Sequence, residues 1–151
     1  MQKYNNLKIR IKKNEGYKSS VYLDQLGNPT IGFGHLIKKN EKELLKGRYS
    51  KKLLEKIFEK DFNNAIDQYY KNFKKYKFSK NIEELLIEMI FQLGIKKLKK
   101  FKRMINYLKS KKVYMASLEM LDSLWYKQTP KRVSLLIKKL LKLKNEKRSR
   151  R

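Results

Sequence analysis

Residues 19–37 read SSVYLDQLGNPTIGFGHLI, and this stretch decides how the rest of the chain is interpreted. Residues that favour β-strands stand on both sides of a central Gly27-Asn28-Pro29 sequence, which is typical of a turn. Four of the six glycines and one of the two prolines fall between residues 16 and 34. We therefore expect a small antiparallel β-hairpin or a three-stranded ribbon here.

Sequence on both sides of this stretch is typical of helices. A short basic first helix is predicted from three apolar residues, although their spacing also suits a strand: Leu7, Ile9 and Ile11. After the hairpin, Asn40 followed three residues later by Glu43 resembles a capping signal, and Gly47 suits a helix end. This pattern predicts one short helix between residues 40 and 47.

A long amphipathic helix is predicted after Ser50, whose hydroxyl can cap its start. Its apolar residues recur at intervals of three and four: Leu53, Leu54, Ile57, Phe58, Phe62, Ala65, Ile66 and Tyr69. This spacing places them on one face of a helix that links two regions of the chain.

The second half of the chain predicts a buried helix followed by shorter ones. Asn81 and Glu84 repeat the capping pattern ahead of IEELLIEMIFQLG, which is apolar on most faces and ends at Gly94. Three more segments have helical stripes: residues 101–108, 113–121 and 133–143. No internal repeat or long linker separates them, so one domain is expected for 151 residues.

The composition is strongly basic, with 40 Lys and Arg, 14 Asp and Glu, and a formal net charge of +26. Such a charge attracts nucleic acids, anionic lipids and anionic cell-wall polymers alike, so it does not choose among them. The absence of cysteine excludes disulfides and thiolate metal sites, and we expect no cofactor and no metal. The N-terminal segment lacks the apolar run of a secretory signal, which predicts accumulation in the cytoplasm.

Glu15 and Asp24 are the only acidic residues among the first forty, and they flank the glycine-rich stretch. A carboxylate at the end of a helix and another on a neighbouring hairpin can face one groove from two sides. A glycosidase needs this arrangement, because one group protonates the leaving oxygen while the other assists water or stabilises charge. Two surface carboxylates paired with local lysines would give the same composition, so the pair alone is weak evidence.

The spacing of these carboxylates belongs to a longer pattern. Glu15-Gly16 is followed by Tyr22, Asp24, Gly27 and then TIGFGHL at 30–36. This pattern resembles the signature of the T-even phage lysozyme family (glycoside hydrolase family 24), in which EG precedes YxDxxGxxTIGxGHL. The similarity continues, in the same order, through residues 58–61, FQLG at 91–94 and WYKQTPKR at 125–132. It covers almost the entire chain, from about Leu7 into the last helix.

The resemblance implies an α+β, mainly α-helical lysozyme-like fold. In such a fold a small β-containing lobe, about residues 14–50, and a helical lobe, about 1–13 plus 51–151, are joined by a long helix with a cleft between them. The implied activity is hydrolysis of the β-1,4 bond between N-acetylmuramic acid and N-acetylglucosamine in peptidoglycan, with inversion, during lysis of a bacterial host. The stretch between His35 and Asp61 is shorter than in the T-even form, which affects the outer sugar subsites.

The resemblance also assigns roles to individual residues. Glu15 is the implied general acid, Asp24 the carboxylate that stabilises positive charge or aids the nucleophile, and Thr30 the hydroxyl that orients water. Arg132 is implied to pair with Glu15. The remaining site residues are interpreted as support or as cleft lining: His35, Asp61, Gln92 and Trp125 as support, and Leu36 and Phe91 as substrate contacts.

His35 is the only histidine, so a general base has to be considered. We favour a structural role, because a charged histidine can stabilise a fold through an acidic partner. In the family the equivalent histidine pairs with an aspartate on the long helix, which corresponds to Asp61 here.

The last helix and the partners leave alternatives open. Residues 133–143 and the basic KNEKRSRR that follows suit either a membrane-surface helix or, as we favour, a helix packed on the body with a frayed basic end. The family implies a monomer that waits in the host cytoplasm until a holin releases it to the cell wall. A basic nucleic-acid-binding protein and a non-catalytic wall- or membrane-binding protein are the alternative functions.

Overall fold

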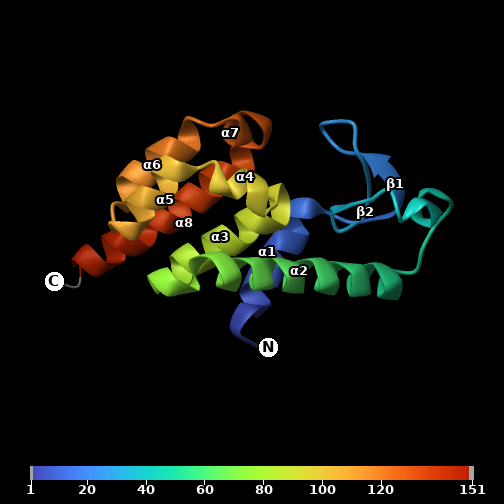
Figure 1. Cartoon of the computed structure of the whole chain (residues 1–151), viewed down its shortest axis with the longest axis horizontal. Coiled ribbons are helices and arrows are strands. Elements are labelled where there is room, and N and C mark those ends of the chain that lie inside the picture. The colour runs from blue at the N-terminus through green and yellow to red at the C-terminus, as the bar shows by residue number, and fades with distance from the viewer. Residues whose placement is uncertain (1, 150–151) are drawn as a thin grey trace. The chain divides into compact units, whose positions relative to one another are not determined.

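The structure is a computed structural model that describes the backbone of residues 2–149 and the side chains of residues 3–141. It is mainly helical with one small antiparallel sheet (Figure 1), as the sequence predicts. In chain order the elements are η1 (Gln2–Tyr4), α1 (Asn5–Glu15), β1 (Lys18–Leu23), β2 (Pro29–Gly32), β3 (His35–Leu36), η2 (Lys42–Leu45), α2 (Lys51–Phe73), η3 (Lys74–Tyr76), α3 (Lys80–Leu93), α4 (Ile95–Lys99), α5 (Lys102–Lys109), α6 (Val113–Leu121), α7 (Leu124–Gln128) and α8 (Pro130–Ser149).

The chain forms two compact units, Met1–Ile66 and Asp67–Arg151, and the boundary falls within the long helix α2. The first unit therefore contains α1, the sheet and the first part of α2. The second contains the remaining helices.

The three strands are antiparallel in the order β1-β2-β3. Thr30 is paired with Tyr22 on one side and with Leu36 on the other, while Ile31 is paired with His35. Because paired residues share a face and successive residues alternate, Thr30 and Leu36 lie on one face and Ile31 and His35 on the other. The register between β1 and β2 is irregular between Lys18 and Tyr22, so a bulge interrupts the first ladder.

The face of Ile31 covers the core of the first unit. Ile31, Ile37, Leu44 and Leu54 form a buried cluster that joins the sheet, η2 and α2. A row of aromatic contacts extends this core along α2 to the N-terminus: Tyr17 with Phe33, Phe33 with Phe58, Phe58 with Phe62, and Phe62 with Tyr4. These contacts fix the β2–β3 turn against α2.

The first two α-helices follow the sequence pattern closely. Leu7 and Ile11 are fully buried one turn apart in α1, whereas Ile9 points to solvent, so the segment is a helix and not a strand. The Ser50 hydroxyl accepts a hydrogen bond from the Leu53 amide at 3.2 Å, which confirms it as the cap of α2.

Two predicted capping signals are wrong. Residues 40–47 form only the short 3₁₀ helix η2, with Glu41 instead of Asn40 before its first residue. The helix α3 begins at Lys80, after Ser79, so Asn81 lies inside its first turn. In both places an asparagine stands three residues before a glutamate, as in a capping box, but the helix begins at a different residue. Gly94 does end α3, with a φ of 83° that glycine adopts without strain.

The second unit packs around α3 and α8. Six apolar residues of α3 are buried, as expected for a central helix: Ile82, Leu85, Leu86, Ile87, Met89 and Ile90. The predicted stripe of the last helix is also buried: Val133, Leu136, Ile137 and Leu140. Its packing against the body is thus confirmed. The helix continues to Ser149, beyond the predicted end at residue 143, and the basic side chains after Leu141 lie outside the described residues.

Candidate active site

Asp24 closes the turn that links β1 to β2. Its Oδ1 accepts hydrogen bonds of 2.8 Å from the amides of Leu26 and Asn28, and its Oδ2 accepts one of 3.2 Å from the Asn28 side chain. Partial desolvation acts to raise the pKa of Asp24, but these hydrogen bonds from Asn28, Leu26 and Gly27 outweigh it and lower the pKa. Asp24 is therefore a carboxylate held in its ionised form.

Thr30 lies at the centre of the sheet, between Tyr22 and Leu36. Its side chain is only 4% exposed, and its hydroxyl donates a hydrogen bond of 3.0 Å to the Asn28 carbonyl. With its proton used in this bond, the hydroxyl oxygen can accept a hydrogen bond from a further donor such as water. The Asn28 backbone thus orients both Asp24 and Thr30.

Glu15 is the last residue of α1, and its carboxyl group lies against Gly34 in the β2–β3 turn. A Cβ atom at Gly34 would stand 2.8 Å from Cδ of Glu15 and closer still to Oε2, a distance that carbon atoms in proteins do not tolerate. Gly34 also has a φ of 78°. Gly34, the second glycine of GFGH, therefore makes room for the carboxyl group of Glu15.

Tyr22 connects the two acids. Burial raises the pKa of the Tyr22 hydroxyl, and the negative charges of Glu15 and Asp24 raise it further. Both carboxylates thus act electrostatically on one phenol group. The carboxylates that the sequence singles out at positions 15 and 24 thus both lie within electrostatic reach of the Tyr22 hydroxyl.

His35 lies on the opposite face of the sheet, between two carboxylates. Its Nδ1 is 2.6 Å from Asp61 on α2, which is the expected partner, and its Nε2 is 2.9 Å from Glu41. Burial acts to lower the pKa of His35, but hydrogen bonds to Asp61 and Glu41 and their charges outweigh it and raise the pKa. With both ring nitrogens facing carboxylates, His35 is positioned as an imidazolium.

Glu41, the second partner of His35, has no role predicted from the sequence. Its carboxylate also accepts a hydrogen bond of 3.0 Å from the Lys38 amide. Burial acts to raise the pKa of Glu41, but the hydrogen bonds from Lys38 and His35 lower it. The signal in the sequence that could have identified Glu41 is the position of an acidic residue shortly after a histidine that becomes buried.

In the second unit, Arg132 of α8 contacts Glu88 of α3, with 3.4 Å between Nη2 and Oε1. Glu88 is fully buried, and the Arg132 side chain is 9% exposed. Glu88 was also missed, although a charged residue inside the apolar run LLIEMIF requires a cationic partner. The expected pair of Arg132 with Glu15 stays a prediction.

Gln92 and Trp125 form a polar network with Thr129. The Trp125 indole donates to Oε1 of Gln92 at 2.9 Å, and Nε2 of Gln92 donates to the Thr129 hydroxyl at 3.3 Å. Trp125 is 3% exposed. The contacts are those of supporting residues. Of the two residues expected to touch substrate, Leu36 is exposed and Phe91 is partly exposed.

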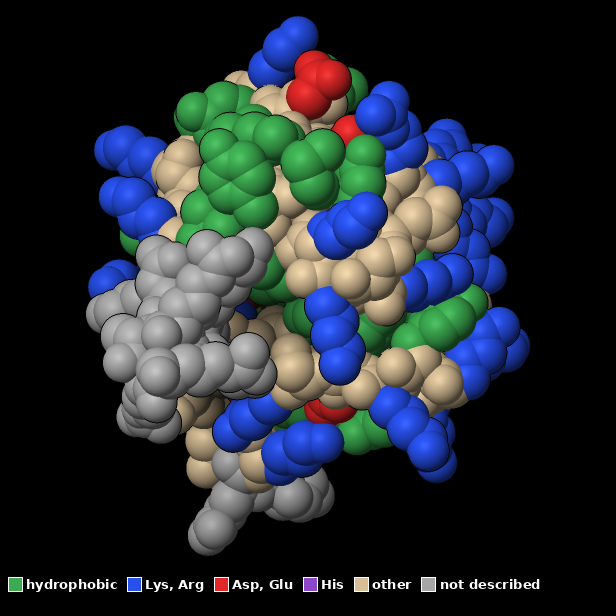
Figure 2. All heavy atoms as spheres, turned by 90° about the vertical axis from the view of Figure 1, so that its left-hand side faces the viewer, with side chains coloured by type: hydrophobic (Ala, Val, Ile, Leu, Met, Phe, Trp, Pro, Cys, Tyr) green, Lys and Arg blue, Asp and Glu red, His purple; other side chains and the backbone are tan. Residues whose placement is uncertain are grey.

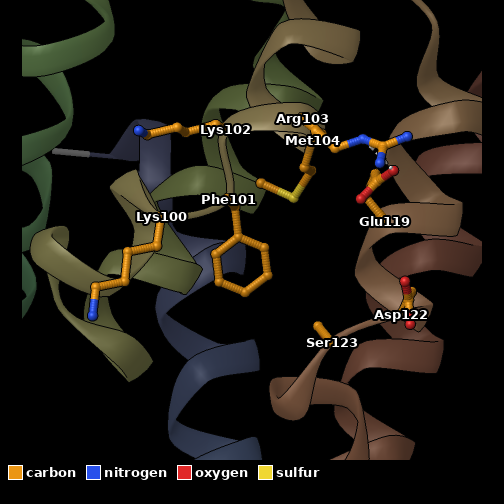
Figure 3. Close-up of a pocket in the computed structure, with 8 residues that line it drawn as sticks. All are labelled: Lys100, Phe101, Lys102, Arg103, Met104, Glu119, Asp122 and Ser123. Carbon is orange, nitrogen blue, oxygen red and sulfur yellow. Dashed lines mark ion pairs between the residues drawn. The ribbon is translucent and has the colours of Figure 1, made fainter.

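A pocket of about 270 Å³ lies next to this network, at the start of α5 and the end of α6 (Figure 3). An ion pair of 3.2 Å between Arg103 and Glu119 lines it. Phe101, which also lines it, contacts the Trp125 ring edge to face at 6.0 Å. These residues carry no pattern in the sequence, since two separate segments, 100–104 and 119–123, contribute them.

Among the described side chains no group of three or more His, Asp or Glu residues could hold a metal ion. The helices of residues 2–149 include none that is long and apolar enough to cross a bilayer.

Glycoside hydrolases use a pair of carboxyl groups, and Glu15 at the end of α1 and Asp24 on the adjoining hairpin supply two in this unit. Comparison with known families supports this class, because residues 12–142 match the family described as phage lysozyme. A protein of Dictyostelium discoideum, probable T4-type lysozyme 2, is 32% identical over 155 residues, which cover 87% of this chain and 91% of that protein. Probable T4-type lysozyme 1 of the same organism is 29% identical with the same coverage. The chain belongs to the phage lysozyme family, and its activity is the hydrolysis of peptidoglycan.

Proposed function

We propose that the chain is an N-acetylmuramidase that cleaves the β-1,4 bond between N-acetylmuramic acid and N-acetylglucosamine, with Glu15 as general acid. The observation that carries this proposal is the fit of the Glu15 carboxyl group against Gly34, because it fixes an acid at the β2–β3 turn while the adjoining β1–β2 turn holds Asp24 ionised. Two carboxyl groups in different protonation states are what glycoside hydrolysis requires.

In the proposed reaction Glu15 donates its proton to the glycosidic oxygen as the bond to the anomeric carbon breaks. Positive charge develops on the sugar ring, and the Asp24 carboxylate stabilises it. The hydrogen bonds of the turn hold Asp24 in place before substrate binds, so no reorganisation is needed during the reaction. Thr30 accepts a hydrogen bond from the attacking water, and the Asp24 carboxylate takes up the proton that this water loses as it bonds to the anomeric carbon.

We infer that the reaction inverts the configuration at the anomeric carbon, with water entering on the face opposite Glu15. Proton NMR of a peptidoglycan digest tests this inference, because an inverting enzyme releases the α-anomer first. Initial release of the β-anomer would require a covalent intermediate and would contradict the assigned role of Thr30.

The first test of the proposal compares Glu15→Gln with Glu43→Gln. Glu43 is exposed in the same unit, so it controls for the loss of one negative charge. Release of soluble peptidoglycan should fall at least a thousandfold in the first variant, because amide cannot supply the proton, and by less than twofold in the second. Residual lysis above a tenth of the wild-type rate in Glu15→Gln would contradict the proposal.

The net charge of +26 favours nucleic-acid binding as a second candidate function. The same proteins are therefore tested for DNA binding over a series of salt concentrations. Binding that falls steeply with salt and is equal in wild type and Glu15→Gln is a general effect of charge. If Glu15→Gln loses hydrolysis, the chemistry of the protein is the cleavage of peptidoglycan and not an effect on DNA.

We further propose that the enzyme acts in lysis of a bacterial host and remains in the cytoplasm until a holin opens the inner membrane. Expression in a bacterium with and without a co-expressed holin tests this role. Cells should remain intact with the enzyme alone and lyse when the holin is present. Lysis without the holin would contradict dependence on it. We also propose that the protein is a monomer and that it binds anionic polymers of the cell envelope.

A further inference from the structure

A second and larger pocket, of about 750 Å³, lies within the second unit, far along the chain from the residues proposed for hydrolysis. Three segments form it: residues 76–82 at the start of α3, residues 108–113 between α5 and α6, and Leu140 of α8. Its apolar lining consists of Phe78, Ile82, Leu108, Val113 and Leu140. A pocket of this volume and lining is in the range of small-molecule sites.

The polar part of the lining is cationic. Four lysines line this pocket: Lys77, Lys80, Lys109 and Lys111. None of the lining residues that the structure describes is acidic. The Lys109 ammonium lies 4.2 Å from the centre of the Tyr76 ring at the same site, so aromatic and cationic groups meet there. Lysine and arginine are common on the face of the molecule that Figure 2 shows, but in this pocket four lysines share the lining with apolar side chains.

Two of the lysines in the lining stand at helix ends. Among the described residues, two that are not glycine have positive φ: Lys77 at 50° and Lys111 at 58°. Both line this pocket. Lys77 follows the end of η3 and Lys111 follows the end of α5, where a residue in the left-handed conformation commonly closes a helix. The two helix ends thus place lysines in the lining of the pocket.

We propose that this pocket binds a single acyl chain with an anionic head group, that is, a fatty-acid-like amphiphile. The chain enters the apolar cavity and the lysines contact the head group. An apolar ligand without charge would leave the lysines without an anionic partner, and a small anion would leave the cavity unfilled. Both features are satisfied together only by an anionic amphiphile.

Isothermal titration of the whole protein with octanoate, decanoate and dodecanoate, each below its micelle concentration, tests the proposal. Burial of a methylene is worth about 0.8 kcal/mol, so the affinity should rise about fourfold for each added carbon until the cavity is full. Nonyltrimethylammonium, which has the nine-carbon alkyl chain of decanoate and the opposite charge, should bind at least tenfold more weakly than decanoate. Equal binding of the two ions would overturn the proposal.

Two variants locate the site. Val113→Phe places a larger side chain in the cavity and should reduce decanoate affinity at least tenfold. Lys77→Gly with Lys111→Gly removes two charges and relieves positive φ, so affinity should fall about fivefold while the protein stays at least as stable. Lys96→Gln with Lys97→Gln, outside the pocket, removes the same charge and should bind like wild type. Unchanged binding in both pocket variants would overturn the proposal.

A final arm distinguishes a free amphiphile from a membrane lipid. Vesicles of phosphatidylglycerol and phosphatidylcholine are titrated with wild type and Val113→Phe. If decanoate binds and vesicle binding is the same in both proteins, the ligand is a free amphiphile. If Val113→Phe weakens both, a membrane lipid also reaches the pocket. Vesicle binding that is equal in both proteins, without any binding of decanoate, would exclude the pocket as the site.

Discussion

Each unit contains carboxylates that are held in opposite ways, Asp24 in the first unit and Glu84 and Glu88 in the second. In the first unit Asp24 is partly exposed and held by hydrogen bonds from uncharged groups. In the second, Glu84 and Glu88 are buried on α3, and each faces a cation from α8, Lys139 and Arg132. The difference indicates that hydrogen bonds from backbone and amide groups keep a carboxylate ionised and accessible, whereas burial beside a cation commits it to stability.

The largest expected effect is on the buried pair of the second unit. Glu88→Gln leaves the Arg132 guanidinium facing a neutral amide, and the free energy of unfolding should fall by about 3 kcal/mol. Urea denaturation followed by the fluorescence of Trp125 measures it. Glu119→Gln is the control, because it breaks the more exposed ion pair with Arg103 and should cost about 0.5 kcal/mol. Equal losses of unfolding free energy in Glu88→Gln and Glu119→Gln would contradict the distinction between buried and exposed acids.

A slightly smaller effect is expected at the candidate site of the first unit. Gly34→Ala places a Cβ atom where the Glu15 carboxyl group lies, so that group must move. A displacement of about 1 Å at a reacting group reduces the rate by about a hundredfold. The control is Gly47→Ala, which also has positive φ but has open space around its Cβ position. Peptidoglycan hydrolysis that falls equally in both variants would point to backbone strain instead of displacement of Glu15.

The loss of stability caused by His35→Asn should depend on pH, and this dependence tests how the carboxylates of the first unit are used. The folded-state pKa of His35 is raised above the unfolded value of about 6.5. Its contribution to stability is therefore complete below that pH and is lost as pH rises through the folded pKa. Wild type should exceed the variant by about 2 kcal/mol near pH 6 and by less at pH 9.

The acid side of the same experiment reports on Glu41, whose pKa is lowered. Its contribution is present above the unfolded value of about 4.5 and is lost as pH falls through the folded pKa. Urea denaturation from pH 3 to 9 should thus show the largest difference between wild type and His35→Asn in the middle of this range. A difference that increases steadily to pH 9 would contradict the imidazolium assignment.

The smallest effect concerns helix caps, where the two units should behave alike. Ser50 accepts from the Leu53 amide at the start of α2, and Ser123 accepts from the Tyr126 amide at the start of α7. Replacing either by alanine should lower the free energy of unfolding by about 1 kcal/mol. Thermal unfolding followed by circular dichroism measures both. No change in either variant would show that these hydrogen bonds are exchanged for water without loss.

Much of the fold follows from local pattern. Stripes of apolar residues predict α2, α3 and α8, and clustered glycines predict the sheet, because spacing and backbone freedom act within a few residues. The predictions of helix caps at Asn40 and Asn81 are wrong, because a three-residue spacing between an asparagine and a glutamate does not determine the residue at which the helix begins. In the structure the carboxylate next to Asn40 is bound to His35, which no local rule anticipates.

The candidate site is predictable only as far as its signature extends. Glu15, Asp24 and Thr30 follow from their spacing and family resemblance, and the pairing of His35 with Asp61 is present in the structure. Glu41, Glu88 and the larger pocket depend on segments that meet only after folding. Lys77 and Lys111 have no sequence signal, because a lysine at positive φ looks like any other lysine in so basic a chain.

The boundary within α2 has a consequence for synthesis. Every residue of the first unit, including the three proposed to act on the glycan, precedes residue 67. At 5–20 residues per second, translation of the 65 residues from Asp67 to Lys131 takes roughly 3 to 13 seconds. During that interval the nascent chain already has the whole sequence of the sheet and its aromatic core, while Arg132 has yet to be made. A ribosome that stalls between residues 67 and 131 therefore releases a fragment with the acid and the aspartate but without the arginine.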